Sequence, residues 1–491
     1  MPHRCRSLLL LACLALAACV TPLQRDLDTT LNPPEIAGIR WGLLVTDAQG
    51  REIAAINPDQ RFLPASNTKL FTTAAAFRWQ DDLAAMLPRL ATFVALEDVG
   101  ETGAPALVLH GRGDPHLADT PDCETRCLAT LADAVAAIGL TTLTHVVGDD
   151  TWFPDERWGP GWSWDDLQTS YGTATSALTV NDNTATLTVA PASEGAPATV
   201  TWAPGDAAYT IVNDTVTAEW PGQGDAAPED DLIVSHLPGT AIVHVAGHVP
   251  PGSAPRAFHL GLDDPALTAA TRLTALLQAR GVTVEGPPMA RHRPPGTPFD
   301  AAFTGLDDGD PPLAALAPPA FPEALADISK DSQNLYAELM LRHLGHIDED
   351  GAAEAGLARV DALLEEAGAA PNGHDLFDGS GMSVYNRVSP RTIVTLLTYA
   401  AAQDWGSAWK DTFPIGGVDG SLQRRFRGTI LEGKIFAKTG TLKGTNALSG
   451  YLTAASGQTL TFAIIANERP LAISSATPMM DAALVRIAET N

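Results

Sequence analysis

The chain has 491 residues, 45% of them hydrophobic, and a formal net charge of −27. This length predicts about three domains, and the apolar content excludes a wholly disordered chain. The acidic balance argues against nucleic-acid binding and against a polybasic membrane patch, because both need clustered Lys and Arg. An acidic, soluble surface is the simpler interpretation.

Residues 1–18 have the pattern of a secretion signal. Arg4 and Arg6 precede the apolar run SLLLLACLALAA, which is too short to span a bilayer. The run ends in Leu-Ala-Ala-Cys, which resembles a bacterial lipobox and predicts that Cys19 becomes the lipidated N-terminus. The alternative is an ordinary signal peptide, cut nearby, with Cys19 incidental. Val20 follows Cys19 and gives no inner-membrane retention signal, so we expect a periplasmic protein anchored at the outer membrane.

Removal of residues 1–18 leaves three cysteines, at positions 19, 123 and 127. An exported chain enters an oxidising compartment, and Cys123 and Cys127 are close enough in sequence to pair as a local disulfide. We favour this pairing over a metal site, because no His or third Cys is close by in the sequence. The spacing alone does not decide whether the bond forms.

From Cys19 to about residue 35 the sequence is short and polar, as expected of a tether. Residues 41–47 and 51–56 then predict a β-hairpin across Ala48-Gln49-Gly50. A helix is expected from Ser66 to about residue 76, which places Lys69 one turn after Ser66 on the same face.

The C-terminal third alternates helical and strand patterns. Helices are expected at 331–345, at 352–367, from 390 to about 402 with Ser389 as N-cap, and at 478–489 with Thr477 as N-cap. Strands are expected at 434–438, 446–453 and 459–466, the last two paired across a turn at 455–457.

About 260 residues separate Lys69 from Ser332. Alternating Thr/Val-rich stretches at 177–189 and 198–216, and a strong helical pattern at 265–280, predict inserted domains there and not one long loop. The segment WFPDERWGPGWSW carries four tryptophans. We interpret these as a packed wall between domains, with a glycan-stacking surface as the alternative.

Three short motifs occur in a meaningful order. The first is Ser66-Asn67-Thr68-Lys69, the second Ser332-Gln333-Asn334, and the third Lys438-Thr439-Gly440. They are the S-x-x-K, S-x-N and K-T-G boxes of penicillin-interacting serine enzymes. The chain has only six lysines, and two of them stand in the two boxes that require one.

With these boxes, the chain resembles the D-alanyl-D-alanine carboxypeptidase/endopeptidases of peptidase family S13, the class C low-molecular-mass penicillin-binding proteins. The resemblance extends over the mature chain and includes the long insertion. It also rests on five blocks: GRGDPHL (111–117), GWSWDDLQTSYGTATSALTVNDN (161–183), FDGSGMSVYNRVSP (377–390), PIGGVDGSLQRRF (414–426) and NALSGYL (446–452).

The resemblance implies an α/β fold. A split transpeptidase/β-lactamase-like domain, an antiparallel sheet flanked by helices, would comprise residues 36–87 and 312–491. An inserted domain would comprise 88–180 and 256–311, and a β-rich third domain, nested in the second, would comprise 181–255. The implied substrates are peptidoglycan stem peptides, cut at the terminal D-Ala-D-Ala bond and at the D-Ala to diaminopimelate cross-link. β-Lactams would be covalent inhibitors.

The chemistry requires these residue types whatever the family. A Ser hydroxyl is a poor nucleophile until a base takes its proton. Lys69 can be that base only when neutral, so burial and the neighbouring Lys438 must lower its pKa. Ser332 would bridge the two lysines and pass a proton to the leaving amine, while Asn334 would hold the substrate amide. The remaining expected substrate contacts come from the third box: Lys438, Thr439, Gly440 and Thr441.

The expected oxyanion hole consists of the backbone N–H groups of Ser66 and Thr441. The mechanism requires no metal and no cofactor. Two departures from the family pattern stand out: Ser-Gln-Asn replaces the commoner Ser-Asp-Asn, and Val384 stands where relatives often carry Arg. Lys443 either replaces that charge or is a solvated surface lysine.

Two other functions use the same boxes. A serine β-lactamase would need a base for deacylation and usually lacks a large insertion. A non-catalytic penicillin-binding envelope protein would have no chemical need for all of Ser66, Lys69, Ser332, Asn334, Lys438 and Thr439. Turnover of nitrocefin and of D-Ala-D-Ala peptides distinguishes these functions from the peptidase.

Overall fold

The computed structural model describes residues 22–34, 36–97, 105–203, 209–219, 231–299, 312–318, 320–347 and 350–491. The expected signal segment and Cys19 lie outside these ranges. No helix within the described ranges is long and apolar enough to cross a membrane.

A five-stranded antiparallel sheet forms the centre of the molecule, with strand order β18-β19-β20-β1-β2. The strands are β1 (Arg40–Thr46), β2 (Glu52–Ile56), β18 (Ile435–Leu442), β19 (Thr445–Thr453) and β20 (Thr459–Asn467). Both expected hairpins, β1–β2 and β19–β20, are confirmed. The pairing of Leu44 with Ala463 joins the two ends of the chain in one sheet, so the central domain is split in the sequence.

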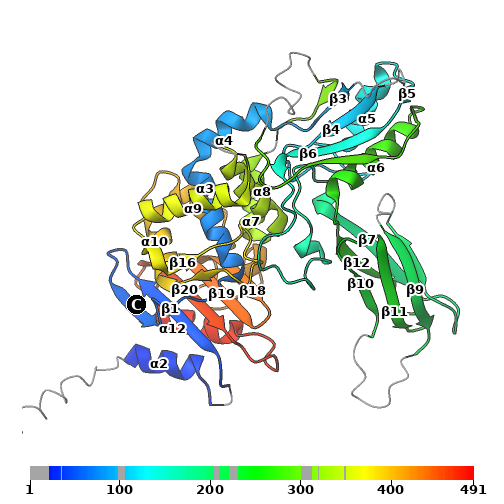
Figure 1. Ribbon diagram of the computed structural model, residues 1–491. Helices are drawn as coiled ribbons and strands as arrows, with labels where there is room; N and C mark the ends of the chain where they lie inside the picture. The colour runs from blue at the N-terminus through cyan, green and yellow to red at the C-terminus, as the bar shows by residue number, and fades with distance from the viewer. Residues whose placement is uncertain are drawn as a thin grey trace, which may run out of the picture.

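Helices cover both faces of this sheet (Figure 1). Because strand side chains alternate between faces, Leu44 and Ala463 enter one core with Phe71 of α3, and Val45 and Ile464 enter the other. The first face carries α3 (Lys69–Arg78), α7 (Phe321–Lys330), α8 (Asn334–Gly345), α9 (Ala353–Glu366) and α10 (Pro390–Ala401). The second carries α2 (Pro22–Leu31) and α12 (Thr477–Thr490).

The expected tether at 19–35 is wrong for residues 22–31, which form helix α2. Leu27 and Leu31, one turn apart, are buried in the core beneath α12. The residues between these two leucines are polar, so the sequence did not indicate a helix here. Residues 19–21 and 35 lie outside the described ranges.

Two helix starts also differ from expectation. Helix α8 begins at Asn334 and not at residue 331, because Ser332 adopts a left-handed backbone conformation (φ 63°) that a helix cannot contain. Helix α12 begins at Thr477 itself, whose N–H is capped by Ser475 Oγ at 3.1 Å. The expected cap at Ser389 is confirmed, since its Oγ accepts from Thr392 N–H at 3.1 Å.

A second five-stranded sheet lies beside the central domain, with order β14-β6-β4-β3-β15. Its strands are β3 (Phe93–Glu97), β4 (Ala106–His110), β6 (Val146–Pro154), β14 (Met289–Arg293) and β15 (Ala314–Ala315). Its core packs against α5 (Leu128–Ala137) and α6 (Pro265–Gln278). The short strands β5 (Thr142–Leu143) and β13 (Thr283–Val284) pair alongside.

Two three-stranded sheets form a separate β-rich lobe (Figure 1). They comprise β7 (Thr184–Ala190), β8 (Thr199–Trp202) and β12 (Arg256–Gly261), and β9 (Thr210–Thr217), β10 (Ile233–His236) and β11 (Ile242–Val249). Since β12 pairs with β7, we propose that the β-rich domain extends to residue 261. Since β15 pairs with β3, we propose that the chain returns to the central domain only after residue 315.

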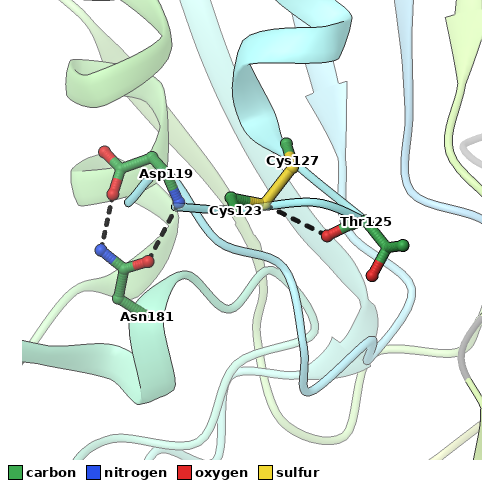
Figure 2. Close-up of a disulfide and its surroundings, with 5 residues drawn as sticks. All are labelled: Asp119, Cys123, Thr125, Cys127 and Asn181. Carbon is green, nitrogen blue, oxygen red and sulfur yellow. Dashed lines mark hydrogen bonds between the residues drawn. A yellow bond between two sulfur atoms is a disulfide. The ribbon is translucent and has the colours of Figure 1, made fainter. Parts of the chain in front are cut away.

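The two cysteines at 123 and 127 form a disulfide with an S–S distance of 2.10 Å (Figure 2). The disulfide closes the loop that enters α5. On the other side of this loop, the backbone N–H of Asp119 donates to Asn181 Oδ1 at 3.0 Å. The expected local disulfide is therefore present.

The tryptophans of the 152–164 segment divide into two groups. Trp152 is fully buried, and Trp162 donates from Nε1 to Asp378 Oδ2 at 3.0 Å, so it joins the inserted segment to the central domain. Trp164, in contrast, is 70% exposed. The packed wall between domains is confirmed for Trp152 and Trp162 but not for Trp164.

Candidate active site

Ser66 lies in a single 3-10 turn, η1 (Ala65–Thr68), which runs directly into α3. Ala65, just before it, has a positive φ of 48°, a conformation that costs a non-glycine residue free energy and is often found at functional sites. Lys69 is the first residue of α3, and its Nζ is 3.1 Å from Ser66 Oγ. The first box therefore has the geometry that its spacing predicts.

Lys69 is fully buried, and its Nζ has three oxygen partners. Besides Ser66 Oγ they are Asn334 Oδ1 and the Ser380 carbonyl oxygen, each at 2.6 Å. An ammonium has three N–H donors, whereas a neutral amine has two donors and one lone pair. The two carbonyl-type oxygens can only accept, so in the neutral amine they take both N–H groups. The lone pair is then left facing the Ser66 hydroxyl.

The second and third boxes meet through Ser332 and Lys438. Lys438 Nζ donates to Ser332 Oγ at 2.8 Å and to the Thr439 carbonyl oxygen at 3.1 Å. Asn334 contacts Lys69 through its oxygen, and its Nδ2 donates to the Tyr171 carbonyl oxygen at 2.8 Å. Ser332 thus pairs with one lysine and Asn334 with the other, so the expected bridge by Ser332 between both lysines stays a prediction.

The third box lies on β18, which is an edge strand. Ala437 N–H points away from β19 to the Pro414 carbonyl oxygen, and strand alternation turns the N–H groups of Thr439 and Thr441 in the same direction. Gly440 faces η1 so closely that a Cβ there would lie 2.7 Å from the Pro64 carbonyl oxygen. This explains why the third box requires glycine between its two threonines.

The electrostatics favour a neutral Lys69, as its role as a base requires, but they also disfavour the charged form of Lys438. Burial lowers the pKa of Lys69 to about 7, although the nearby carboxylates of Asp378 and Glu338 raise it. Burial also lowers the pKa of Lys438 well below its usual range, and the charge of Lys69 lowers it further, against Asp331. Repulsion between two amines is mutual, so the lysines titrate as a coupled pair.

Ser66 opens onto a cleft of about 600 Å³. Ser332, Asn334 and Thr441 line its floor, and Ser163, Asp165, Asp166 and Tyr171 line the wall that comes from the inserted segment. Val384, which is 42% exposed, lies in the same cleft as Lys443 and Arg469. The cleft therefore carries opposite charges on its walls, from the pair Asp165 and Asp166 and from the pair Lys443 and Arg469.

Sequence reasoning missed several residues that hold the site together. The Ser380 carbonyl oxygen, Glu338 and Asp378 surround Lys69, and Ser421 contacts Thr439 Oγ1 at 2.7 Å. Ser380 and Asp378 belong to the FDGSGMSVYN block, and Ser421 to PIGGVDGSLQRRF. Those blocks were quoted for the resemblance only. A backbone carbonyl carries no sequence signal, but Glu338, one helical turn after Asn334, could have been noticed.

Within the described ranges, one group of side chains has ligand atoms close enough to share a cation. It consists of Asp150, Asp155 and His292. Hydrogen bonds to Asp150 and Asp264 raise the pKa of His292 to about 10, so its ring is protonated at neutral pH and cannot ligate. The Arg157 guanidinium also contacts Asp155 at 2.8 Å and Asp264 at 3.3 Å. This cluster is an ion-pair network, and it lies apart from the residues that line the Ser66 cleft.

Comparisons with known proteins agree with this geometry. The profile of the D-Ala-D-Ala carboxypeptidase 3 (S13) family matches residues 23–490. The chain is 34% identical over 495 residues to the D-alanyl-D-alanine carboxypeptidase of Actinomadura sp. (strain R39), covering 97% of this chain and 86% of the relative. It is 26% identical to the D-alanyl-D-alanine carboxypeptidase DacB of Haemophilus influenzae, over 89% of this chain and 86% of that relative.

The fold has a matching solved structure. The crystal structure of penicillin binding protein 4 (dacB) from H. influenzae superposes with a TM-score of 0.76 at 24% identity, covering 96% of this chain and 98% of that one. Its complex with a novel β-lactam superposes with a TM-score of 0.69. Fold and boxes together define a penicillin-interacting serine enzyme. The chain belongs to the S13 family, and it is a D-Ala-D-Ala carboxypeptidase.

The loop that presents the Ser380 carbonyl oxygen gives a direct test of the site's geometry. Gly381 has a φ of +89°, and a Cβ there would lie 2.0 Å from the Ala65 carbonyl oxygen, next to Ser66. We expect Gly381→Ala to lower the rate of covalent labelling by fluorescent penicillin at least tenfold, because relief of the clash displaces Ser66 or the loop.

Gly368→Ala is the matched control, since Gly368 has φ +79° but open space around it. It should cost about 1 kcal/mol of stability and leave labelling unchanged. Equal labelling rates in the two variants would contradict this account of the loop.

Proposed function

We propose that Ser66 is the acylated nucleophile, Lys69 its general base, and Ser332 the residue that protonates the leaving amine. Asn334, Lys438, Thr439, Gly440 and Thr441 would bind the substrate. The observation that carries this proposal is the contact of Lys69 Nζ with Ser66 Oγ and with two oxygens that can only accept. In that environment a neutral amine has one orientation available to it, with its lone pair on the nucleophile.

Acylation follows from these contacts. Lys69 takes the Ser66 proton as Oγ bonds to the carbonyl carbon of the penultimate D-Ala. The oxyanion accepts from the N–H groups of Ser66 and Thr441, which supports charge that develops only in the transition state. When the C–N bond breaks, Ser332 gives its proton to the leaving nitrogen. Ser332 then takes the proton held by Lys69, so Ser332 is a hydroxyl and Lys69 a neutral amine again, and the proton that left Ser66 is balanced by the one now on the leaving amine.

Deacylation completes the cycle. A water oxygen bonds to the ester carbonyl carbon, and the water proton passes through Lys69 to Ser66 Oγ as the acyl C–O bond breaks. The free enzyme is thereby restored, and the stem peptide leaves one D-Ala shorter. In its charged form, which an incoming carboxylate would favour, Lys438 would attract the terminal carboxylate of the substrate, and Thr439 and Thr441 would hydrogen-bond that carboxylate on the open edge of β18.

We also propose D,D-endopeptidase activity on peptidoglycan cross-links. The bonds form and break in the same sequence as in the carboxypeptidase reaction, except that the leaving amine belongs to a diaminopimelate side chain of a second stem peptide. Lys443 and Arg469, which line the same cleft as Asp165 and Asp166, would supply positive charge where Val384 does not. Purified sacculi, digested with the protein and analysed for released muropeptides, test this activity.

Penicillin should react at Ser66 and at no other residue. Ser66→Ala removes the only nucleophilic atom that Lys69 faces, so covalent labelling by a fluorescent penicillin should be abolished while the circular dichroism spectrum is unchanged. Ser456→Ala, in the exposed β19–β20 turn, is the matched control and should label normally. A penicilloyl adduct found by mass spectrometry on another residue would contradict the assignment of Ser66 as the acylated residue.

The pH dependence of acylation should be bell-shaped. The rate rises as the amine pair loses its first proton, which leaves Lys69, with its pKa lowered to about 7, able to act as a base. It falls as the pair loses its second proton, because no ammonium then remains to hold the substrate carboxylate. Lys438→Ala removes a carboxylate contact and a repulsive charge. Peptide turnover should therefore drop about a hundredfold or more, and the rising limb should move to higher pH because Lys69 is then protonated more easily.

The matched control is Lys434→Ala, which changes an exposed lysine four residues upstream and should leave the rising limb in place. An unmoved limb in Lys438→Ala would show that Lys438 does not tune Lys69.

Peptidase and β-lactamase differ in how fast water removes the acyl group. A leaving D-Ala departs and opens a path for water, whereas the amine of an opened β-lactam stays attached and can block it. We expect steady release of D-Ala from a pentapeptide stem, a long-lived penicilloyl-enzyme, and no effect of EDTA on either reaction. Rapid multiple-turnover hydrolysis of nitrocefin, with no D-Ala released from any stem peptide, would favour the lactamase.

We propose that Cys19 carries a lipid that anchors the protein at the outer membrane, facing the periplasm. Support comes from the Leu-Ala-Ala-Cys sequence, with Val20 after it. Cys19→Ser should move the protein from the membrane fraction to the soluble periplasmic fraction, and it should abolish metabolic labelling by a fatty-acid analogue. Cys13→Ser, within the apolar run, is the control. If Cys19→Ser stays in the membrane fraction, the anchor proposal is wrong.

A further inference from the structure

Glu338 is a buried carboxylate directly beneath the active site, and the mechanism above gives it no role. It lies on α8 one turn after Asn334, so the two side chains share a face of the helix. The residue is 1% exposed. Three groups that can only donate contact its oxygens: Oε1 accepts from the Gly379 and Ser380 N–H groups at 3.0 and 2.8 Å, and Oε2 accepts from Arg342 Nη1 at 3.2 Å.

These contacts fix the peptide unit that presents a partner to Lys69. The Gly379 and Ser380 N–H groups are held by Glu338, the Gly379 carbonyl oxygen accepts from Thr72 Oγ1 at 2.8 Å, and the Ser380 carbonyl oxygen accepts from Lys69 Nζ. Glu338 thereby holds the loop from one side and α3 holds it from the other. Without the carboxylate, two buried N–H groups would have no acceptor, which is unfavourable in the protein interior.

Asp378 holds the other end of the same loop. Its Oδ1 accepts from Gly381 N–H at 3.0 Å and its Oδ2 from Ser383 N–H at 2.6 Å. The charged groups that face Lys69 are therefore Glu338 from α8, Asp378 from the loop and Lys438 from β18. Those that face Glu338 are Asp378 and Arg342, and the Arg342 guanidinium also donates to the Glu156 carbonyl oxygen at 2.8 Å.

We propose that Glu338 is a positioning residue, which holds the Ser380 carbonyl oxygen against Lys69 and places a negative charge behind that amine. The inference rests on the proposed role of Lys69 as the base. Glu338 has two effects in this position: its hydrogen bonds orient the lone pair of Lys69 toward Ser66, and its charge sets the pH at which that lone pair becomes available.

The direction of the charge effect follows from the sign of the charge. A carboxylate favours the ammonium form of a neighbouring lysine, and Glu338 is one of the two groups that raise the pKa of Lys69 against burial. Burial raises the pKa of Glu338 itself, and Asp378 raises it further, against Arg342. The two backbone N–H groups and the Arg342 guanidinium at its oxygens nevertheless favour the ionised form.

The test is the pH profile of penicillin acylation in Glu338→Gln. The substitution removes the charge and keeps the shape, so the rising limb should move to lower pH by about half a unit or more. The maximal rate should fall at least tenfold, because an amide cannot accept from both the backbone N–H groups and Arg342. Glu354→Gln, at an exposed position on α9, is the matched control and should leave the profile unchanged.

Two further variants separate positioning by charge from loss of fold. Glu338→Asp keeps the charge, so the rising limb of its pH profile should lie at the same pH as in the wild type, while its maximal rate falls. Thr72→Val removes only the contact with the Gly379 carbonyl oxygen, and it should also lower the rate without moving the limb. If Glu338→Gln unfolds, a limb in Glu338→Asp that moves to lower pH overturns the proposal. So does an unmoved limb in a folded Glu338→Gln.

The outcome for Glu338 is distinguishable from failure of the proposed function. A wild-type profile without a rising limb, or penicillin labelling that persists in Ser66→Ala, would reject Lys69 and Ser66 themselves. A normal wild-type profile with an unmoved limb in Glu338→Gln would reject only the role of Glu338.

Discussion

A lysine amine excluded from water is the constraint on which this structure depends. Lys69 has no solvent to stabilise its charge, so its protonation is decided by the oxygens and carboxylates that surround it. Those groups come from α8, from the 378–383 loop and from the Ser66 turn, which are far apart in the sequence. Much of the central domain can be understood as the packing that brings them to within hydrogen-bonding distance of one nitrogen.

Backbone strain is concentrated at the same place. Ala65 and Ser332 both have left-handed backbone conformations, and each adjoins or belongs to a box. Such residues are stable only when surrounding contacts fix them. Here η1 is fixed by Gly440 and Gly381, which leave no space for a Cβ. Ser66, which follows Ala65 directly, lines the cleft.

The boxes and the order of the elements could be predicted from the sequence because they depend on local patterns. The strands β1, β19 and β20 have strong apolar runs, and the helix at Ser389-Pro390 has a clear start signal. Helix α2 was missed because the segment is polar on average and only two of its ten residues are buried. The start of α8 was placed three residues early because the strain at Ser332 comes from tertiary contacts.

In the site, the six box residues were predictable because their chemistry is in their side chains. The Ser380 carbonyl oxygen was not, since every residue has a carbonyl and only the fold selects which one faces Lys69. Glu338 and Asp378 were missed for a related reason: a carboxylate in a helix or loop is usually solvated, and nothing local indicates that these two are buried. Ser421 reaches Thr439 across a sequence separation that no periodic pattern covers.

The split sheet also has a consequence for the order in which the protein matures. β1 pairs with β20, and β18 packs against the Ser66 turn, so both ends of the chain must be joined before the site is complete. During synthesis, Ser66 therefore emerges long before the strands that complete its surroundings. Such long-range pairing is slow to form. A hydrolase assembled in this way has no functional centre as a nascent chain, and its activity begins only after the last strands have joined the sheet.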